Sequence, residues 1–256
     1  GIIAASKNKI GMHGVAYGSE LISAITAFRD ALSPKQENEL SELLQKQIDE
    51  LNKDNGPEDS LKDEPAIIAE SKAKRFITQQ LLPVLKASGA QIINNSWGSP
   101  SSLKEATLYW PEILKDQIIQ GIVDIAKQGT LQVWAAGNHG RPDPALHAFL
   151  PHFMPELEAY WLTVVATDRN NQIADLSNYC GITANWCLAA PGVEISSSVN
   201  NNGYRSMSGT SMAAPHVTGA IALAMQRFPY MDNKQIREVI LTSANNTEHL
   251  SNTAIY

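Results

Sequence analysis

Three short apolar segments that alternate with a helical pattern constrain the fold more than any other feature. Residues 91–98 (QIINNSWG), 131–138 (LQVWAAGN) and 160–168 (YWLTVVATD) are apolar runs bounded by turn residues, as expected of buried strands. Between the first two, residues 114–127 carry apolar side chains at helical spacing. Strands that alternate with helices predict an α/β fold, in which helices cover both faces of a parallel sheet.

Functional residues are expected at the ends of these strands, because active sites of parallel sheets lie at the carboxyl ends of strands. The polar passage NNSWGSP leaves the first strand, and AAGNHG leaves the second. In the second passage, Asn138 is compatible with two roles. It is either an ordinary turn residue or a side-chain amide that donates a hydrogen bond to an oxyanion.

A serine lies where a later helix begins, in the stretch GTSMAAPHVTGAIALAM over residues 209–225. Free backbone N–H groups and the helix dipole would stabilise an oxyanion formed beside Ser211. By itself, a serine at this place is more commonly a helix cap than a nucleophile. The G-x-S-x-G motif of α/β-hydrolases is not matched, because Ala213 takes its last position, and this argues against a serine esterase of that type.

Negative charge is concentrated in one segment of the 256-residue chain, which has 20 Lys and Arg against 26 Asp and Glu. Residues 35–64 contain four lysines and ten acidic residues, which accounts for the whole excess. A chain that carries no net charge outside one acidic segment lacks the basic surface that a nucleic-acid partner would need. The start at Ser33 and Pro34, followed by an apolar stripe, predicts that residues 33–65 are an acidic, mainly helical insertion. A second helix is predicted over about residues 66–85.

No apolar run reaches the ~18 residues that a membrane-spanning helix needs, so no transmembrane segment is predicted in this chain.

The chain's two cysteines, Cys180 and Cys187, enclose the turn-like sequence GITANW. Their spacing fits neither a CxxC redox motif nor a zinc site. They are either two buried free thiols or a local disulfide. We favour the disulfide, because the turn-like residues let the two ends meet. Such a bond requires an oxidising compartment.

Five stretches resemble, in order, the subtilisin-like serine proteases (subtilases). GTSMAAPHVTGAIAL looks like the family's nucleophile signature, WAAGN its oxyanion-asparagine segment, and QIINNSWGSP the strand along which substrate lies. GMHGVAYGSELISAITAF is similar to the segment after the family's histidine helix, and residues 161–195 to the strands that lead back to the serine. The resemblance covers nearly the whole chain except residues 33–65. It implies a subtilisin-like fold and a serine endopeptidase that cleaves polypeptides through an acyl-enzyme.

Carried over position by position, the resemblance implies that Ser211 is the nucleophile. Its backbone N–H and the Asn138 amide would be the two oxyanion donors. The implied substrate contacts are Ser96, Trp97, Gly98, Ala135, Ala136, Gly137, Gly209 and Thr210. Residues 96–98 would pair with the substrate as an added strand. The small residues 135–137 would line the pocket for the residue before the scissile bond and leave room there for a bulky side chain.

The family activates its serine with a His that is oriented by an Asp, in the chain order Asp, His, Ser. Neither its Asp-Ser-Gly or Asp-Thr-Gly motif nor its His-Gly-Thr-His motif occurs in this sequence, and the resemblance places Gly1 at the end of the His motif. We therefore expect residues 1–256 to be the C-terminal portion of one catalytic domain, lacking the N-terminal strands that carry the Asp and His, and inactive alone. The expected partner is that missing part of the same protease, and self-association over the open sheet edge is the alternative.

None of the six histidines in the chain is expected to act as the base. His216 lies five residues after Ser211 on the same helix, and a rotation of about 500° turns it away. The others lie after the resembled histidine helix, beside Asn138, in a predicted loop or in the tail: His13, His139, His147, His152 and His249.

The cysteine pair and the insertion are most similar to subtilases of Gram-negative autotransporters, which implies export through the periplasm to the cell surface or beyond. No cofactor is expected to be required. Calcium sites are common in the family, but no motif here supports one, and no metal ligands are assigned. The rival hypothesis is a non-catalytic fragment or degenerate protease that serves as a surface interaction module. The intact Ser211 and Asn138 favour the enzyme.

Overall fold

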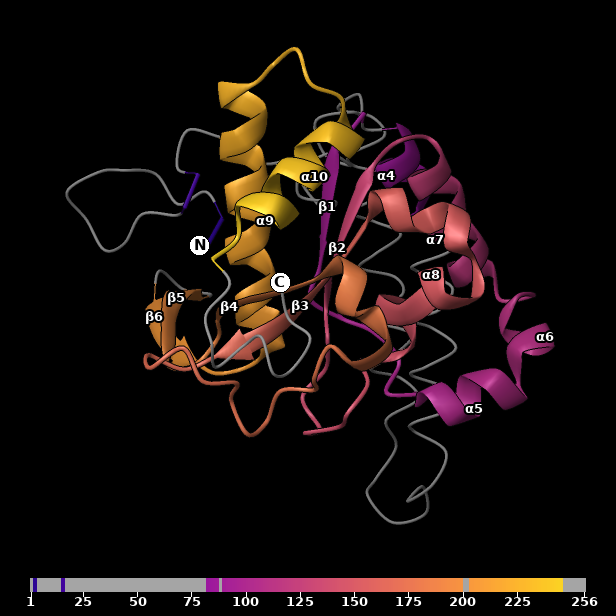
Figure 1. Cartoon of the computed structure of the whole chain (residues 1–256), viewed down its shortest axis with the longest axis horizontal. Helices are drawn as coiled ribbons and strands as arrows, with labels where there is room; N and C mark the ends of the chain where they lie inside the picture. The colour runs from indigo at the N-terminus through magenta and orange to yellow at the C-terminus, as the bar shows by residue number, and fades with distance from the viewer. Residues whose placement is uncertain (1, 4–14, 17–81, 88, 200–202, 246–256) are drawn as a thin grey trace, which may run out of the picture. The chain divides into compact units, whose positions relative to one another are not determined.

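A computed structural model describes residues 2–3, 15–16, 82–87, 89–199 and 203–245 (Figure 1). The chain divides into two compact units, one of residues 1–21 with 90–256 and the other of residues 22–89. The predicted acidic insertion, 33–65, lies outside the described residues, as do His13 and His249. The predicted helix over about 66–85 lies mostly outside them. Of the second unit, the structure describes α4 (Leu82–Ala87), which has Pro83 in its first turn.

Four strands form the main sheet of the described residues, in the order β1-β2-β3-β4 (Figure 1). They are β1 (Ile92–Asn95), β2 (Leu131–Ala135), β3 (Trp161–Thr167) and β4 (Cys187–Pro191). All neighbouring pairs are parallel. Strand β3 is buried along its whole length, as in a sheet covered on both faces. The predicted α/β fold with a parallel sheet is confirmed.

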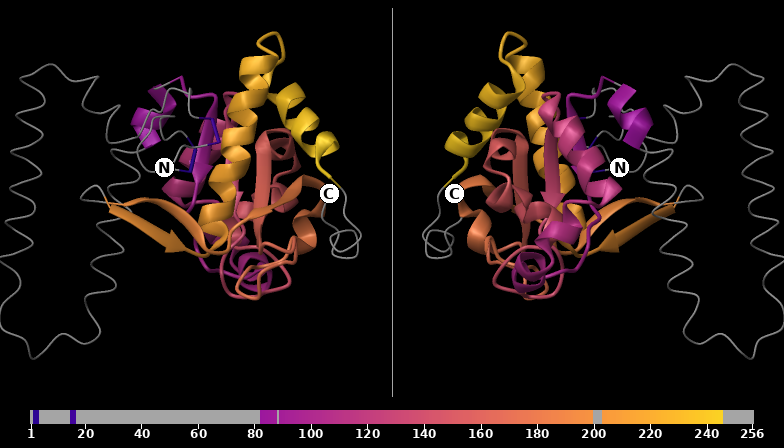
Figure 2. Two further views of the ribbon diagram at one scale, coloured as in Figure 1. Left: turned by 90° about the vertical axis from the view of Figure 1, so that its left-hand side faces the viewer. Right: turned by 90° about the vertical axis from the view of Figure 1, so that its right-hand side faces the viewer.

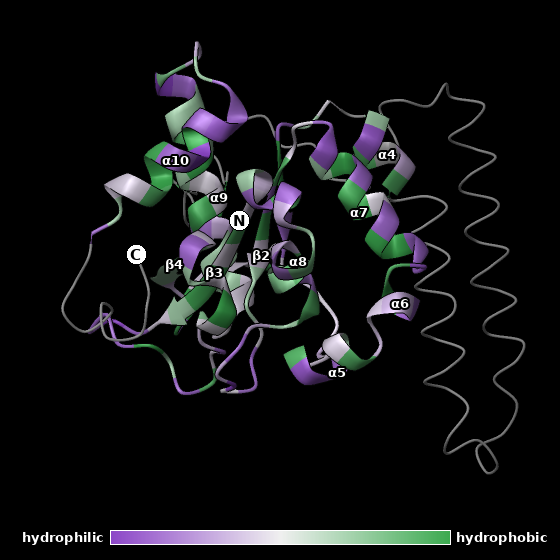
Figure 3. Cartoon of the chain, turned by 45° about the vertical axis from the view of Figure 1, so that its right-hand side comes forward, coloured by the Kyte–Doolittle hydropathy of each residue, from purple (hydrophilic) through white to green (hydrophobic). Residues whose placement is uncertain are grey.

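The connection from β1 to β2 contains three helices: α5 (Leu103–Leu108), α6 (Trp110–Ile113) and α7 (Gln117–Lys127). Helix α7 is the one predicted over 114–127, and its apolar and polar stripes are visible in Figure 3. It begins later than predicted because Asp116 caps it. The Asp116 carboxylate accepts a hydrogen bond from the Ile118 N–H at 2.7 Å.

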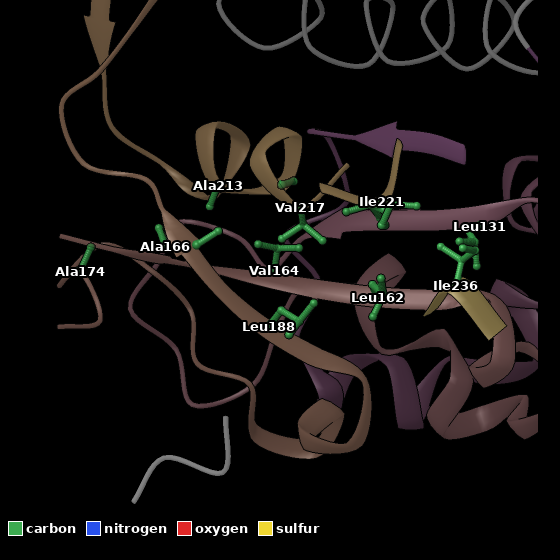
Figure 4. Packing of buried hydrophobic residues seen from close by; sticks show 13 residues of the cluster. Leu131, Leu162, Val164, Ala166, Ala174, Leu188, Ala213, Val217, Ile221 and Ile236 are labelled. Carbon is green, nitrogen blue, oxygen red and sulfur yellow. The ribbon is translucent and has the colours of Figure 1, made fainter. Parts of the chain in front are cut away.

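Helix α9 (Thr210–Arg227) crosses one face of the sheet and contacts all four strands (Figure 2). Helix α10 (Asn233–Ser243) packs beside it. Figure 4 shows the core between α9 and the strands, which includes the buried residues Leu162, Val164, Leu188, Ala213, Val217 and Ile221. Because burial of apolar surface is the dominant favourable term in folding, this core fixes where α9 begins relative to the strand ends.

The sheet face opposite α9 is covered by short helices. These are η2 (Leu146–Phe149), α8 (Leu150–Phe153), η3 (Pro155–Tyr160) and η4 (Gly181–Trp186). The carbonyl oxygen of Ala148 in η2 links this helix to the sheet and to η4. It accepts hydrogen bonds from Thr163 Oγ1 of β3 at 2.9 Å and from Trp186 Nε1 of η4 at 3.2 Å.

The expectation that His147 and His152 lie in a loop is wrong. His147 lies in the 3₁₀-helix η2, and His152 lies in the single-turn helix α8. Helices of one turn are too short to produce the periodic pattern from which helices are predicted, and 3₁₀ spacing departs from that pattern as well.

A separate hairpin leads into α9. Its antiparallel strands are β5 (Ile195–Val199) and β6 (Gly203–Met207). The hairpin was not predicted, because most of its side chains are polar or exposed and lack the apolar alternation that marks a half-buried strand.

The predicted disulfide is present between Cys180 and Cys187, whose Cα atoms are 5.8 Å apart. Both residues are fully buried. The bond spans η4 and joins the turn before that helix to the first residue of β4.

Replacing both cysteines by alanine should lower the free energy of unfolding by about 2 kcal/mol, the chain-entropy value for a loop this short. Urea unfolding of the double variant and of the unaltered protein, both without reductant, measures this difference. A change below about 0.5 kcal/mol would mean that the loop keeps its conformation without the bond.

Candidate active site

Ser211 lies in the first turn of α9 and does not cap the helix. The N-cap residue is Gly209, which has no side chain that could make a capping hydrogen bond. The Ser211 hydroxyl donates instead to the carbonyl oxygen of Ser96, at the long distance of 3.3 Å. The Ser211 backbone N–H has no acceptor within the described part of the chain, as expected in the first turn of a helix.

The side chain of Ser96, the residue after β1, also bonds to Ser211. Its hydroxyl donates to the Ser211 carbonyl oxygen at 3.0 Å and accepts from Asn94 Nδ2 at 3.0 Å. Thr218, two turns along α9, donates to Asn94 Oδ1 at 3.0 Å. The carboxyl end of β1 and the start of α9 are therefore tied together by side chains from both elements.

Asn138 lies in the passage that leaves β2, and its side chain is oriented by Thr210. The Thr210 N–H and the Thr210 hydroxyl both donate to Asn138 Oδ1, at 2.8 and 2.9 Å. Because both partners are donors, the oxygen of the amide faces Thr210 and the Nδ2 group faces away. Asn138 is exposed, and its Nδ2 has no acceptor among the described residues. The hydroxyl of Thr210, which is buried, also accepts from the Gly137 N–H at 3.1 Å.

Two glycines leave the space that Asn138 and its neighbours occupy. A Cβ atom on Gly209 would lie 3.1 Å from Asn138 Nδ2. Gly137 has a φ of 107°, and a Cβ there would lie 2.5 Å from Asn178 Nδ2. A side chain at position 137 would be excluded both by this backbone conformation and by the contact.

Six of the eight predicted substrate contacts lie at or just after the ends of the adjacent strands β1 and β2, and they are not equally accessible. Ala135 and Gly137 are half-buried and Gly98 is exposed. Ala136 is fully buried and packs in a cluster with Val165 and the disulfide. Its side chain is therefore part of the core, whereas Ala135 and Gly137 are partly accessible.

Trp97 packs into the body of the protein as part of an aromatic cluster with His147, Trp134 and Trp161. Its ring centroid lies 5.2 Å from that of Trp134, in edge-on geometry, and 5.1 Å from that of His147. Trp134 in turn stacks on His147 at 5.0 Å and on Trp161 at 5.7 Å. This cluster was not predicted from the sequence, because its members come from four separate segments.

His147 holds the end of the segment after β1. Its Nδ1 accepts a hydrogen bond from the Ser99 N–H at 3.1 Å, so Nδ1 is the unprotonated ring nitrogen. Burial lowers the pKa of His147 to about 4, and the charge of Asp116 opposes this only in part. The ring is therefore neutral at neutral pH, and it serves as an acceptor for the backbone rather than as a base for Ser211.

The other described histidines make no hydrogen bond to Ser211 either. The His216 Nδ1 is 2.8 Å from the Met212 carbonyl oxygen of its own helix, and His152 lies edge-on against Phe153. His139 is exposed next to Asn138. No histidine of the described residues is hydrogen-bonded to Ser211.

Within the described ranges, no group of three or more His, Cys, Asp or Glu residues could hold a metal ion. None of the described helices has both the length and the apolar character that crossing a membrane requires.

The depressed pKa of His147 predicts acid sensitivity. Its folded pKa of about 4 lies below the ordinary 6.5. Between these two pH values, His147 is therefore protonated in the unfolded chain and neutral in the folded chain. Stability should therefore be unaffected above pH ~6.5 and fall as the pH drops toward 4, by on the order of 2 kcal/mol at pH ~4.5.

His147→Asn tests this prediction, because Asn offers an acceptor to the Ser99 N–H and does not titrate. Urea unfolding at pH ~7 and ~4.5 should show a smaller loss of stability for the variant than for the unaltered protein. Equal losses in the two proteins would assign the acid sensitivity to other groups.

Comparison with known proteins agrees with this geometry. The family model described as Peptidase S8, subtilase family, matches residues 1–255. Serotype-specific antigen 1 of Mannheimia haemolytica is 31% identical over 95% of this chain and 28% of its own length. An extracellular serine protease of Serratia marcescens is 31% identical over 95% of this chain and 25% of its length. The chain thus spans about a quarter of the length of these curated relatives.

Among solved structures, the self-cleaved protease domain of PatA is similar to this chain. It is 26% identical in sequence, with a TM-score of 0.57, and the match covers 72% of this chain and 66% of that one.

Proposed function

The chain belongs to the subtilase family, and from this premise we propose that it carries the nucleophile and the oxyanion hole of a serine endopeptidase. The observation that supports this most strongly is the orientation of Asn138. Thr210 holds the amide oxygen, which leaves the Nδ2 group of an exposed side chain free to donate. The next residue after Thr210 is Ser211, whose backbone N–H is also free among the described residues.

In the proposed reaction, the Ser211 hydroxyl attacks the carbonyl carbon of a peptide bond. The negative charge that develops on the carbonyl oxygen receives hydrogen bonds from Asn138 Nδ2 and from the Ser211 N–H. The dipole of α9 favours the same charge, because both donors lie at the N-terminal end of that helix. The amine leaves after it receives the proton that a base took from the Ser211 hydroxyl, an acyl-enzyme forms on Ser211, and water then hydrolyses it.

A base must remove the proton of the Ser211 hydroxyl, and we propose that it comes from outside this chain. Ser211 donates to a backbone carbonyl oxygen here, which cannot take a proton. The sequence has neither the Asp motif nor the His motif of the family. The proposed source is the part of the same protease that carries those motifs, so the 256 residues alone would be inactive.

The substrate is proposed to be a polypeptide that pairs with residues 96–98 as an added strand. Ala135 and Gly137 are proposed to form one wall of the pocket for the residue before the scissile bond, and their small size leaves room for a bulky side chain. The chemistry needs no cofactor. The disulfide, together with relatives that include an extracellular protease and an autotransporter lipoprotein, supports a secreted or cell-surface location reached through the periplasm.

The rival function is a non-catalytic interaction module, and labelling with a fluorophosphonate probe separates the two. The full-length protein should label, Ser211→Ala should abolish the label, and the isolated 256 residues should label negligibly. A full-length protein that does not label would exclude the protease.

Asn138→Ala should lower kcat by about 10²- to 10³-fold with little change in KM, the loss measured for one oxyanion donor in subtilisin, another member of this family. Asn233→Ala is a matched control, because its side chain also bonds backbone groups but lies at the start of α10. Steady-state kinetics on a peptide substrate measure both. If Asn233→Ala lowers kcat as much as Asn138→Ala does, then Asn138 has no special role in the reaction.

A further inference from the structure

We propose that Asn178 is the positioning residue of the oxyanion hole, an inference that rests on the function proposed above. Asn178 lies after β3, forty residues from Asn138 in the chain, and is only 1% exposed. It was not identified from the sequence, where it reads as an ordinary turn residue in LSNYCG. In the fold it holds residues 136–141, which we call the Asn138 loop.

The side chain of Asn178 makes three hydrogen bonds to the backbone of the Asn138 loop. Nδ2 donates to the Ala136 carbonyl oxygen at 2.9 Å. Oδ1 accepts from the His139 N–H at 3.0 Å and from the Arg141 N–H at 3.1 Å. Both the donor and the acceptor of the Asn178 side-chain amide are therefore hydrogen-bonded to the loop.

The backbone of Asn178 completes the contact, because its N–H donates to the Gly137 carbonyl oxygen at 2.9 Å. Asn138 is thus flanked on both sides by backbone groups that Asn178 holds, the Gly137 C=O before it and the His139 N–H after it. Buried backbone groups without such partners would each carry a desolvation cost. No other described side chain bonds to more than one backbone group of the loop.

Asn178 can hold the loop because it is itself fixed to the sheet. Ser177 Oγ accepts from the Ala166 N–H of β3 at 3.0 Å and donates to the Asn178 carbonyl oxygen at 2.8 Å. Two residues further along, Cys180 enters the disulfide. The amide also occupies the space beside Gly137 in which a Cβ would lie.

The two supports of Asn138 are therefore separate. Thr210 orients its side chain from α9, and Asn178 places its backbone from the turn after β3. An oxyanion donor must lie within a few tenths of an ångström of its working position, and misplacement by about 1 Å can reduce the rate by 10²-fold. Loss of Asn178 should let the loop shift without removing the Asn138 amide.

The test is a double-mutant cycle in the full-length protein, with kcat and KM measured on one peptide substrate. Asn178→Ala should lower kcat by on the order of tenfold to a hundredfold, with KM within about twofold. In an Asn138→Ala background, the same substitution should change kcat less than about twofold, since the donor that it positions is already gone. A general loss of structure would lower kcat by the same factor in both backgrounds.

Asn178→Asp has nearly the same volume and keeps the acceptor for His139 and Arg141, but it sets a second oxygen against the Ala136 carbonyl oxygen and adds a charge at a buried position. A cooperative urea-unfolding transition of both Asn178 variants at the assay pH guards against misfolding. Both variants should change kcat less than about twofold in the Asn138→Ala background. Asn233→Ala, which removes donors to the Gly129 and Gln91 carbonyl oxygens, is the control and should leave kcat within about twofold.

The outcomes separate the two proposals. If Asn138→Ala lowers kcat and the effect of Asn178→Ala persists undiminished in that background, the positioning role is wrong and the proposed oxyanion hole stands. If neither Asn138→Ala nor Ser211→Ala affects cleavage, the proposed function fails, and the positioning role fails with it.

Discussion

Two hydrogen bonds from Thr210 to the oxygen of the Asn138 amide hold the candidate site together. They join the end of β2 to the start of α9, two elements that are 72 residues apart in the chain. Their geometry depends on where α9 begins, which is set by the apolar core between this helix and the sheet. It also depends on the parallel register of β1 and β2, which brings residues 96–98 and 135–138 to the same edge of the sheet.

The architecture could be predicted from local sequence patterns because its signals are local. Apolar runs bounded by turn residues marked β1, β2 and β3, helical spacing marked α7, and the turn-like residues between Cys180 and Cys187 favoured a disulfide. The start of α7 could not be predicted as closely, since a cap such as Asp116 is recognised only when the first turn is known.

The support of the site could not be predicted in this way. Asn178 acts on residues about 40 positions away and has no unusual local context. Thr210 acts on a residue 72 positions away, and only its place in the resembled nucleophile signature pointed to it. The aromatic cluster around His147 likewise combines residues from η2, two strands and the segment after β1. Such contacts depend on tertiary packing, so a polar residue in a turn reads the same whether it is solvated or holds a loop. The polar hairpin β5–β6 was missed because it lacks a buried apolar face.

The central claim is that Asn138 and the Ser211 N–H form one oxyanion hole. Its most direct test is a crystal structure of the full-length protein with a peptidyl phosphonate bound covalently to Ser211. One phosphonyl oxygen is expected to lie about 2.7–3.1 Å from both Asn138 Nδ2 and the Ser211 backbone nitrogen. A phosphonyl oxygen turned away, with Asn138 Nδ2 more than about 4 Å from it, would contradict the proposed oxyanion hole.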